Sequence, residues 1–464
     1  MSKPGSEMPG AGLERSITLS GAIALVVGGV VGAGVFVLVE KIAAQAGAAV
    51  WLSFVVAIVI SLIGVIPVIQ LAGALPRAGA GYLFSSRLLS PFWGVMTSFW
   101  VVLGGAASTS VVALTLGVYL QHYAGPSLPA SWIAAGMLLL FYGIYLFGVR
   151  LAISLQLVMA LQFVAALIIY GVAGWFHAEV TIRLLPPHGA APFFMSVLLA
   201  YSTCMGFQVV AEMGEEIRNA RRNIPLALLI GGAIVACIYI LMSMVYVALP
   251  APANAAETAA RRAMSESAAR FLPGALVRFI DIGALTAGLT SLNAAAIALP
   301  RELFAQARDG MLPGFLARVN PRTHTPQHAV TVYFLFVAVL LISGLDVNFF
   351  GCAAAIGILA ISSALGFAAM RLPSRFPSSY ARAYITFPRP LLAACAWATA
   401  LFSLGFAAVV AFEEPGVLVL YAVWSMLVVL YYRVRVRGFA EGDWERLRVI
   451  PGSGEEQDQP VTPC

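Results

Sequence analysis

One stretch of the sequence has residue types that could bind an ion without using a charged side chain. It is centred on Val30, Val31, Gly32, Ala33 and Gly34, and four glycines fall between positions 28 and 34. Glycine lowers the cost of unwinding a helix. An unwound turn exposes backbone N–H groups, and the helix that follows directs its positive dipole end at the gap, so such a gap binds a carboxylate. The alternative is close helix packing through small residues.

A second stretch, near 193–208, has a small and polar middle. Its candidate site residues are Tyr201, Ser202, Thr203, Met205, Gly206 and Phe207. The two stretches interrupt the first and the sixth apolar runs of the chain, which hold corresponding places in two sets of five. Interrupted segments in corresponding places of two repeats are typical of the binding site of a transporter.

The elements that must position these stretches are membrane helices. Of 464 residues, 61% are hydrophobic and 10% are charged, whereas a soluble domain has about 25% charged residues. The mean hydropathy is +0.91. A span needs roughly 20 apolar residues, so we expect an all-α polytopic membrane protein with twelve transmembrane helices. The runs lie near 18–43, 48–73, 91–120, 131–148, 151–176, 191–211, 225–249, 275–300, 328–345, 347–370, 390–412 and 416–433.

These runs predict one transporter domain between two short tails. If both tails are cytoplasmic, 21 of the 27 Lys and Arg residues lie inside, as the positive-inside rule requires. We therefore expect a multi-pass protein of the plasma (inner) membrane with both termini in the cytoplasm. The predicted parts are a tail at 1–17, the transporter domain at 18–434 (a first repeat at about 18–176, a second at about 191–371, two further helices at about 390–433) and a tail at 435–464.

Other classes of function find no support in the sequence. The arginines are spread over short loops and form no compact basic patch for a nucleic acid. The five cysteines and five histidines have no metal-ligand spacing, and neither a nucleophile–base motif nor a nucleotide-binding loop is present. We expect no enzyme activity, no metal and no cofactor.

Four motifs, in order, resemble those of the amino acid–polyamine–organocation (APC) superfamily. They are Gly32–Phe36, similar to the GSGIF-type break of the first helix; Pro76–Tyr82, similar to P-x-A-G-G-x-Y; Glu215–Pro225, similar to EExxNPxRxxP; and Pro300–Pro313, similar to SRxxYAMARDGxLP. The resemblance covers 17–434. It implies a five-plus-five inverted repeat followed by two helices, with the first and sixth helices broken, and transport by alternating access.

The resemblance also implies a role for the backbone of the two stretches in binding a zwitterion. The N–H groups that would meet the α-carboxylate belong to Gly32, Ala33 and Gly34, and the carbonyls that would meet the α-ammonium lie near Val30, Val31, Ser202, Thr203 and Met205. Ser202 stands where the family has a gating aromatic. This departure predicts a roomier pocket, unless Tyr201 or Phe207 forms the lid.

A second departure concerns coupling. Several relatives have a lysine in the fifth helix that links it to the break of the first helix. The run near 151–176 has none, and Gln162 or Phe163 occupies the expected place. A glutamine cannot hold a proton at neutral pH, so coupling through a lysine is excluded. Glu212 is expected at the inner end of the sixth helix, facing an arginine of the loop that follows.

Side-chain specificity has few candidates in the sequence. Ser108, Ser291 and Asn293 are polar residues within apolar runs, although small hydroxyls in membrane helices often serve as interhelical contacts. Because no acidic residue is expected at mid-depth, we predict a neutral amino acid as substrate. The predicted function is secondary active transport, by symport or exchange. The alternatives are transport of an amine or polyamine and, in a different class, a transport-inactive receptor.

The expected partners follow from this function. They are the small-molecule substrate, membrane lipid, and a proton or a counter-substrate, with no nucleic acid. The outer loop near 121–130 has no cysteine with which to form a disulfide to another chain. We therefore expect a monomer or a non-covalent homodimer.

Overall fold

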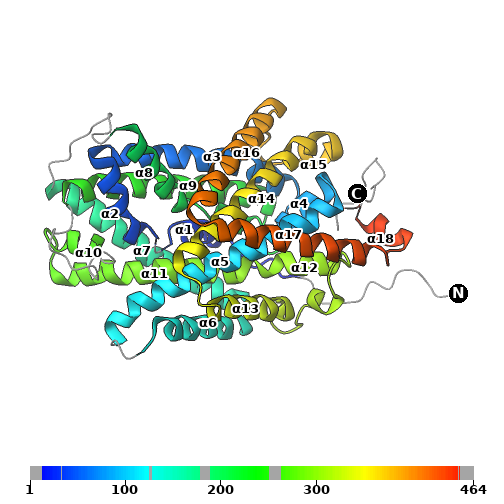
Figure 1. Ribbon diagram of the computed structural model, residues 1–464, viewed down its shortest axis with the longest axis horizontal. Helices are drawn as coiled ribbons and strands as arrows, with labels where there is room; N and C mark the ends of the chain where they lie inside the picture. Colours follow the sequence, from blue (N-terminus) through cyan, green and yellow to red (C-terminus); the bar gives the residue numbers. More distant parts are fainter. Residues whose placement is uncertain are drawn as a thin grey trace.

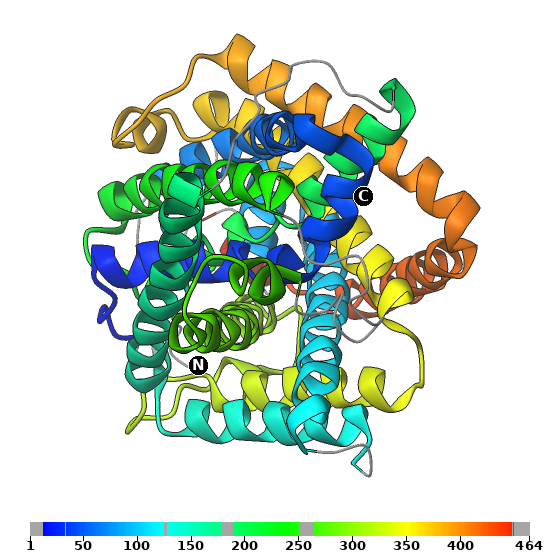
Figure 2. The ribbon, with the colours of Figure 1, turned by 90° about the vertical axis from the view of Figure 1, so that its left-hand side faces the viewer.

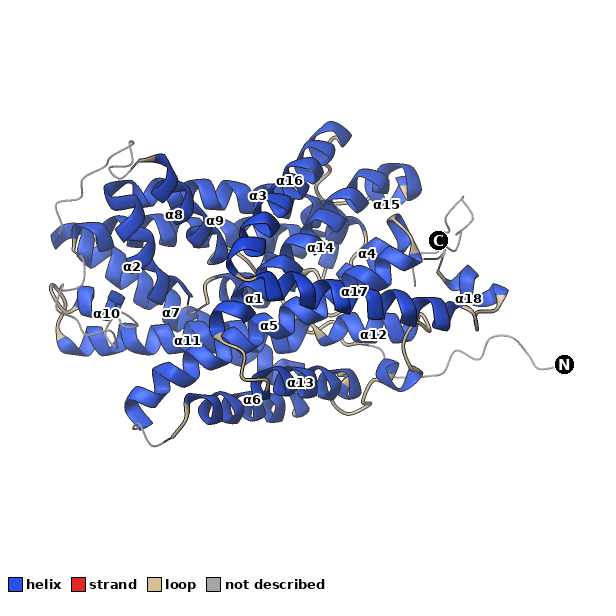
Figure 3. Cartoon of the chain, in the orientation of Figure 1, coloured by secondary structure: helices blue, strands red, loops and turns tan. Residues whose placement is uncertain are grey.

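The computed structural model describes residues 13–32, 34–124, 128–177, 189–249, 263–447 and 449. Within these residues the chain is helical and has no strand, and the extended pairings are two isolated β-bridges (Figure 3). The all-α expectation is therefore confirmed for the described part of the chain. Most of both predicted tails lies outside the described residues.

Nine helical segments of the described chain are long and apolar enough to cross a membrane. Eight contain the long helices, and the ninth is Pro192–Val210. The long helices are α3 (Val50–Ala74), α5 (Pro91–Ala124), α7 (Val149–His177), α9 (Ala220–Ala248), α11 (Gly274–Ala298), α14 (Val347–Arg375), α16 (Arg389–Glu413) and α17 (Pro415–Val436).

Three shorter apolar helices complete the pattern of predicted runs. They are α1 (Leu19–Val30), α6 (Ala130–Leu146) and α13 (Gln327–Ile342). Every predicted run therefore overlaps a helix of the described chain, while the number of spans stays a prediction. The other helices are α2 (Gly34–Ala46), α4 (Ala80–Leu88), α8 (Ala190–Ser202), α10 (Ala263–Ala268), α12 (Pro300–Arg308), α15 (Pro377–Ala381) and α18 (Glu441–Arg446).

The helix α1 lies inside the bundle, and α16 and α17 lie at its rim (Figure 2). α1 contacts α7, α9 and α11, and its Leu25 and Val26 are fully buried. On α16, by contrast, Leu401, Leu404 and Phe412 are 67%, 69% and 90% exposed. Large apolar side chains on an outer helix are stable when hydrocarbon surrounds them. The rim thus has the surface of a membrane-embedded bundle.

The two ends of the bundle are formed by different short helices. The helices α4, α12, α15 and α18 lie at one end, and α2 and α10 lie at the other (Figure 1). Arg87 and the pair Arg301 and Arg308 belong to α4 and α12 at the first end. Two β-bridges, Ile17–Ile217 and Ala78–Met213, join the loops there. We call this end the arginine-rich end.

Candidate functional site

The first apolar run is divided where its glycines lie. α1 ends at Val30 and α2 begins at Gly34, so Val31 and Gly32 lie between two helices. Ala33 is outside the described residues. Val31 is fully buried and Gly32 is partly buried. The break that the glycine spacing predicts is therefore present.

The last carbonyls of α1 supply the negative pole of this break. The Gly28 carbonyl accepts a hydrogen bond from Ser291 Oγ of α11 at 3.0 Å. The carbonyls of Gly29 and Val30 have no hydrogen-bond partner in the described part of the chain. Because the C-terminal end of a helix is the negative end of its dipole, these carbonyls can accept an ammonium group.

The second interrupted run is also broken in its middle. α8 ends at Ser202, and the 3₁₀ turn η2 (Phe207–Val210) begins after Gly206. Gly206 has φ +115°, which lies in the left-handed region that favours glycine. The Ser202 carbonyl has no hydrogen-bond partner among the described residues. This run therefore supplies a second set of backbone groups that helical bonds leave available.

Two carbonyls of the second break are bound by neighbouring helices. Thr203 O accepts a hydrogen bond from Tyr239 Oη of α9 at 2.9 Å, and Cys204 O accepts one from Ser61 Oγ of α3 at 3.4 Å. The Met205 carbonyl has no such partner in the described chain. The neighbours thus fix the shape of the break and leave Met205 O available.

The two breaks meet at a pair of glycines. A Cβ atom added to Gly206 would lie 2.4 Å from the Gly29 carbonyl oxygen, closer than real Cβ atoms come to any neighbour. Conversely, a Cβ atom added to Gly29 would lie 3.5 Å from the Gly206 carbonyl oxygen, which is an ordinary van der Waals contact. The contact therefore requires glycine at position 206 on two grounds, its positive φ and the backbone that faces it.

A chain of hydrogen bonds from α7 and α11 holds α1 in place. Gln156 of α7 donates to the Ala24 carbonyl at 3.3 Å and accepts from Asn293 Nδ2 of α11 at 2.8 Å. Asn293 also donates to the Ala152 carbonyl at 2.9 Å. The side chains of Ser291 and Asn293, which were predicted to set specificity, therefore both make interhelical hydrogen bonds in this conformation.

Gln156, and not Gln162, links α7 to α1. Gln162 donates to the Phe279 carbonyl of α11 at 3.0 Å and accepts from Thr286 Oγ1 of the same helix. A link from Gln162 or Phe163 to the break of the first helix therefore stays a prediction. A polar residue in an apolar run, such as Gln156, indicates a buried hydrogen bond. The face of α7 on which Gln156 lies determines that its partners are Ala24 and Asn293.

The aromatic residues beside Ser202 pack on other helices. Tyr201 lies edge-on to Phe402 of α16, with ring centroids 4.8 Å apart. Phe207 approaches Gly232 of α9. The exposed Ser202 hydroxyl donates to the carbonyl three residues earlier in its own helix. Tyr201 is thus held by the rim of the bundle, and a lid formed by either aromatic stays a prediction.

Ser108 is the remaining predicted residue, and nothing connects it to the breaks. It lies half-buried on α5, and its hydroxyl has no hydrogen-bond partner among the described residues. The nearby Thr109 instead bonds Tyr333 Oη of α13 at 2.7 Å. A specificity role for Ser108 therefore stays a prediction.

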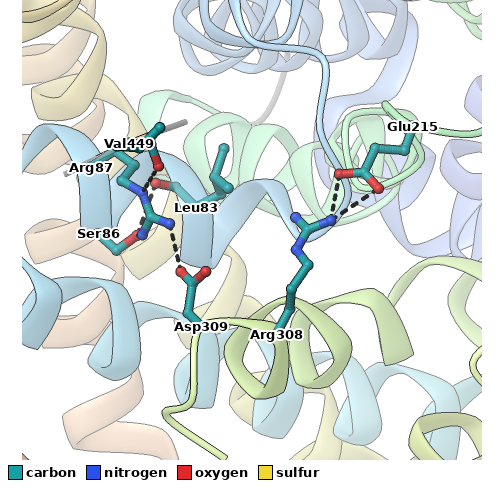
Figure 4. A network of polar contacts seen from close by, with 7 residues as sticks. All are labelled: Leu83, Ser86, Arg87, Glu215, Arg308, Asp309 and Val449. Carbon is teal, nitrogen blue, oxygen red and sulfur yellow. Dashed lines mark hydrogen bonds and ion pairs between the residues drawn. The ribbon is translucent and has the colours of Figure 1, made fainter. Parts of the chain in front are cut away.

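Ion pairs join the loops at the arginine-rich end. Arg301 of α12 and Glu216 are both fully buried and form a bidentate pair at 2.8 to 3.1 Å. Arg308 of the same helix binds Glu215 at 2.8 and 3.1 Å (Figure 4). These pairs connect the chain after η2 to α12, two segments that both lie within the predicted second repeat.

A third pair connects α4 to the loop after α12. Arg87 lies 2.7 Å from Asp309 and also bonds Ser86 and the Val449 carbonyl (Figure 4). Both charged side chains are almost completely buried. A buried pair of this kind costs desolvation of two charges and is held by its additional hydrogen bonds.

Glu212 has a different environment from the one expected. It was predicted to face an arginine, but its carboxylate accepts the N–H groups of Ala80 and Gly81 at 2.8 and 3.3 Å. Glu302 accepts the next N–H of α4, that of Tyr82, at 3.0 Å, so the two carboxyl groups bind the same turn of α4. Burial and then Glu302 raise the pKa of Glu212 well above its ordinary value. Sequence reasoning missed Glu302, since its neighbour in space lies far away in the chain.

The broken helices, the apolar rim and the uncharged breaks define a multi-pass helical membrane protein of the transporter class. The sequence profile of the amino acid permease family matches residues 17–433. The chain belongs to the amino acid permease family, within the APC superfamily, which confirms the resemblance drawn from the four motifs.

Three relatives that the chain resembles are named as transporters. An uncharacterized transporter of Mycobacterium tuberculosis is 29% identical over 330 residues, which cover 71% of this chain and 74% of that protein. The human cationic amino acid transporter 4 is 30% identical over 353 residues, covering 71% of this chain and 55% of the relative. A vacuolar cationic amino acid transporter 4 of Arabidopsis thaliana is 27% identical, with 71% and 58% covered.

Proposed function

We propose that this protein is a secondary active transporter of a neutral amino acid. The observation that supports this most directly is the contact of the two helix breaks at Gly29 and Gly206, beside carbonyls that helical bonds leave available. A zwitterion needs a positive and a negative pole to leave water, and two broken helices offer both without charged side chains.

Within this proposal, the start of α2 binds the substrate carboxylate through the N–H groups of Gly32, Ala33 and Gly34. The ammonium group binds carbonyls at the end of α1, at Val30 and Val31, and in the second break at Ser202 and Met205. Thr203 O contributes less, because Tyr239 already uses it as an acceptor. Small side chains suit such a site, since the backbone makes the contacts.

The neutral character of the substrate is supported by the residues around the breaks. Gln156, Thr290, Ser291 and Asn293, which face α1 from α7 and α11, are all uncharged. A cationic side chain normally needs a carboxylate or an aromatic face. A second candidate is a cationic amino acid, favoured by the names of the human and plant relatives.

Transport would proceed by alternating access in a twelve-helix, five-plus-five arrangement with both termini cytoplasmic. The arginine-rich end has the excess of positive charge that the positive-inside rule assigns to the cytoplasm. The pairs Arg301–Glu216 and Arg308–Glu215 bridge the loops at this end. These pairs would separate when the cytoplasmic end opens.

The test is uptake by purified protein in proteoliposomes. A panel contains leucine, arginine and the decarboxylated amine of each, with and without proton and sodium gradients. We expect saturable leucine uptake that the amines do not inhibit. Arginine uptake would favour the second candidate, and amine uptake would favour an amine transporter. If no compound is taken up and none shifts the melting temperature, the protein is not a transporter of this class.

Two variants test the site itself. Gly32→Leu should abolish uptake and leave membrane insertion intact. Gly136→Leu on α6 is the matched control, because nothing lies within 4 Å of a Cβ placed there. Normal uptake by Gly32→Leu would contradict the assignment of the first break.

A further inference from the structure

A cavity at the arginine-rich end is lined by arginines and not by acids. It has a volume of about 570 Å³ and lies where α3 ends and α9 begins. Four guanidinium-bearing residues line it, together with two neutral polar ones. They are Arg15, Arg77, Arg221 and Arg222, with Asn219 and Ser379.

The positive charge of the cavity is not balanced by the carboxylates nearby. Glu215, the acid that acts on Arg77, is bonded to Arg308 through both oxygens. Glu216, the neighbouring acid, pairs with Arg301. Among the described residues, no salt bridge joins Arg15, Arg77 or Arg221 to an acid.

The arginines also act on one another. Burial, first, and the charges of Arg308, Arg15 and Arg221 lower the pKa of Arg77, against the effect of Glu215. Like charges repel more strongly where burial lowers the local dielectric constant than in water, and Arg77 and Arg221 are partly buried. An anion in the cavity would remove this repulsion, and guanidinium groups are suited to phosphate because they can donate two parallel hydrogen bonds.

The backbone at the start of α9 adds to the positive electrostatic potential of the cavity. α9 is 29 residues long, and its N-cap residue, Asn219, has φ +47° and makes no side-chain cap. The N–H groups of Ala220 and Arg221 have no acceptor in the described chain. The positive end of a long helix dipole therefore faces the arginine-lined space.

The four arginines come from three separate segments of chain. Arg15 precedes α1, Arg77 follows α3, and Arg221 and Arg222 begin α9. The segments already touch, since Ile17 and Ile217 form a β-bridge and Arg218 Nε donates to the Arg15 carbonyl at 3.1 Å. A ligand that binds all four arginines would hold the three segments together.

We infer that this cavity is an anion site that binds a phosphate group, supplied either by the headgroup of an anionic lipid or by soluble phosphate. A volume of this size lies within the range of small-ligand pockets, about 300–1,000 Å³, and basic pockets between membrane helices suit lipid headgroups. The site is separate from the helix breaks and does not depend on the proposed transport activity.

The test measures the melting temperature of the full-length protein in nanodiscs of neutral phosphatidylcholine. In one arm inorganic phosphate is titrated, and in the other phosphatidylglycerol replaces part of the lipid. A ligand that binds the folded state raises the melting temperature, and we expect a rise of at least about 2 °C. A rise with phosphatidylglycerol alone identifies a headgroup site, and a rise with both identifies a site for any accessible phosphate.

The variant Arg77→Gln/Arg221→Gln should lose most of this rise. Arg433→Gln/Arg437→Gln is the matched control, because it removes two exposed arginines at the end of α17 and the same net charge. The control should keep the full rise. Equal rises in both variants would show a non-specific surface effect and overturn the proposal. The absence of any rise in the unmodified protein would also overturn it.

Discussion

Glu212 and Glu302 bind successive N–H groups in the first turn of α4, Glu212 those of Ala80 and Gly81 and Glu302 that of Tyr82. Glu212 is 3% exposed and Glu302 is fully buried. Two buried carboxyl groups that share one helix turn disfavour each other's charge, and burial, followed by Glu302, raises the pKa of Glu212. The positive end of α4 favours the charged form.

The raised pKa of Glu212 makes stability depend on pH. Because the pKa of Glu212 is raised, its contribution to stability is complete below the ordinary value of 4.5 and is lost as pH rises through the raised value. The loss should approach about 1.4 kcal/mol per pH unit within that window. Glu212→Gln keeps a neutral hydrogen-bonding group, so its melting temperature should vary less between about pH 5 and about pH 9 than that of the unmodified protein.

The matched control for this experiment is Glu413→Gln, which removes an exposed acid at the end of α16. Its pH dependence should equal that of the unmodified protein. If Glu212→Gln shows that same dependence, the carboxyl group of Glu212 does not contribute to the pH dependence of stability.

The glycine contact between the breaks predicts a severe effect of one methyl group. Gly206→Ala would place Cβ 2.4 Å from the Gly29 oxygen at a φ of +115°. We expect a loss of about 1–3 kcal/mol of stability and uptake below about a tenth of the unmodified rate. Thermal unfolding and proteoliposome uptake measure both. Gly143→Ala, where nothing lies within 4 Å of the added Cβ, should leave both unchanged, and a tolerated Gly206→Ala would refute the contact.

The hydrogen-bond chain predicts unequal effects of two glutamines on the same helix. Gln156→Ala removes the bonds from α7 to Ala24 of α1 and to Asn293 of α11, which should cost about 1–3 kcal/mol and reduce uptake. Gln162→Ala breaks contacts to α11 and should leave the position of α1 and the substrate KM unchanged. Equal KM changes in the two variants would contradict the assignment of Gln156.

The ion pairs of α12 predict a contrast set by burial. Arg301→Gln leaves Glu216 fully buried without its partner, which should cost about 3–5 kcal/mol. Arg308→Gln removes a pair whose side chains are 26% and 15% exposed, and this should cost about 1 kcal/mol. Chemical denaturation of the two variants would compare these losses. A similar loss in both would mean that burial does not control the strength of these pairs.

The lysine content allows a direct test of orientation. The chain has two lysines, Lys3 and Lys41, and Lys41 is exposed on α2 at the end opposite to the arginine-rich end. In intact cells, a membrane-impermeant amine reagent should label the peptide with Lys41 and not the one with Lys3, as mass spectrometry would show. Lys41→Arg removes the labelled position. Labelling of Lys3 alone would reverse the proposed orientation.

Local composition predicts the features that depend on neighbouring residues in the chain. Four glycines in seven positions predict the division of the first run, because unwinding is a local property of the backbone. Apolar runs predict helices, because the cost of exposed backbone groups in hydrocarbon allows little else. The four ordered motifs determined the family, which the match over residues 17–433 confirmed.

Contacts between groups that are distant in the chain become visible when the helices are packed together. The contact of Gly206 with Gly29, the choice of Gln156 over Gln162, and the binding of Glu212 and Glu302 to one turn of α4 all depend on how helices are rotated and shifted against one another. The arginine-lined cavity likewise combines three segments of chain. A one-residue change in helix register turns a side chain by about 100°, so composition and spacing do not determine such contacts, whereas close packing of the assembled bundle does.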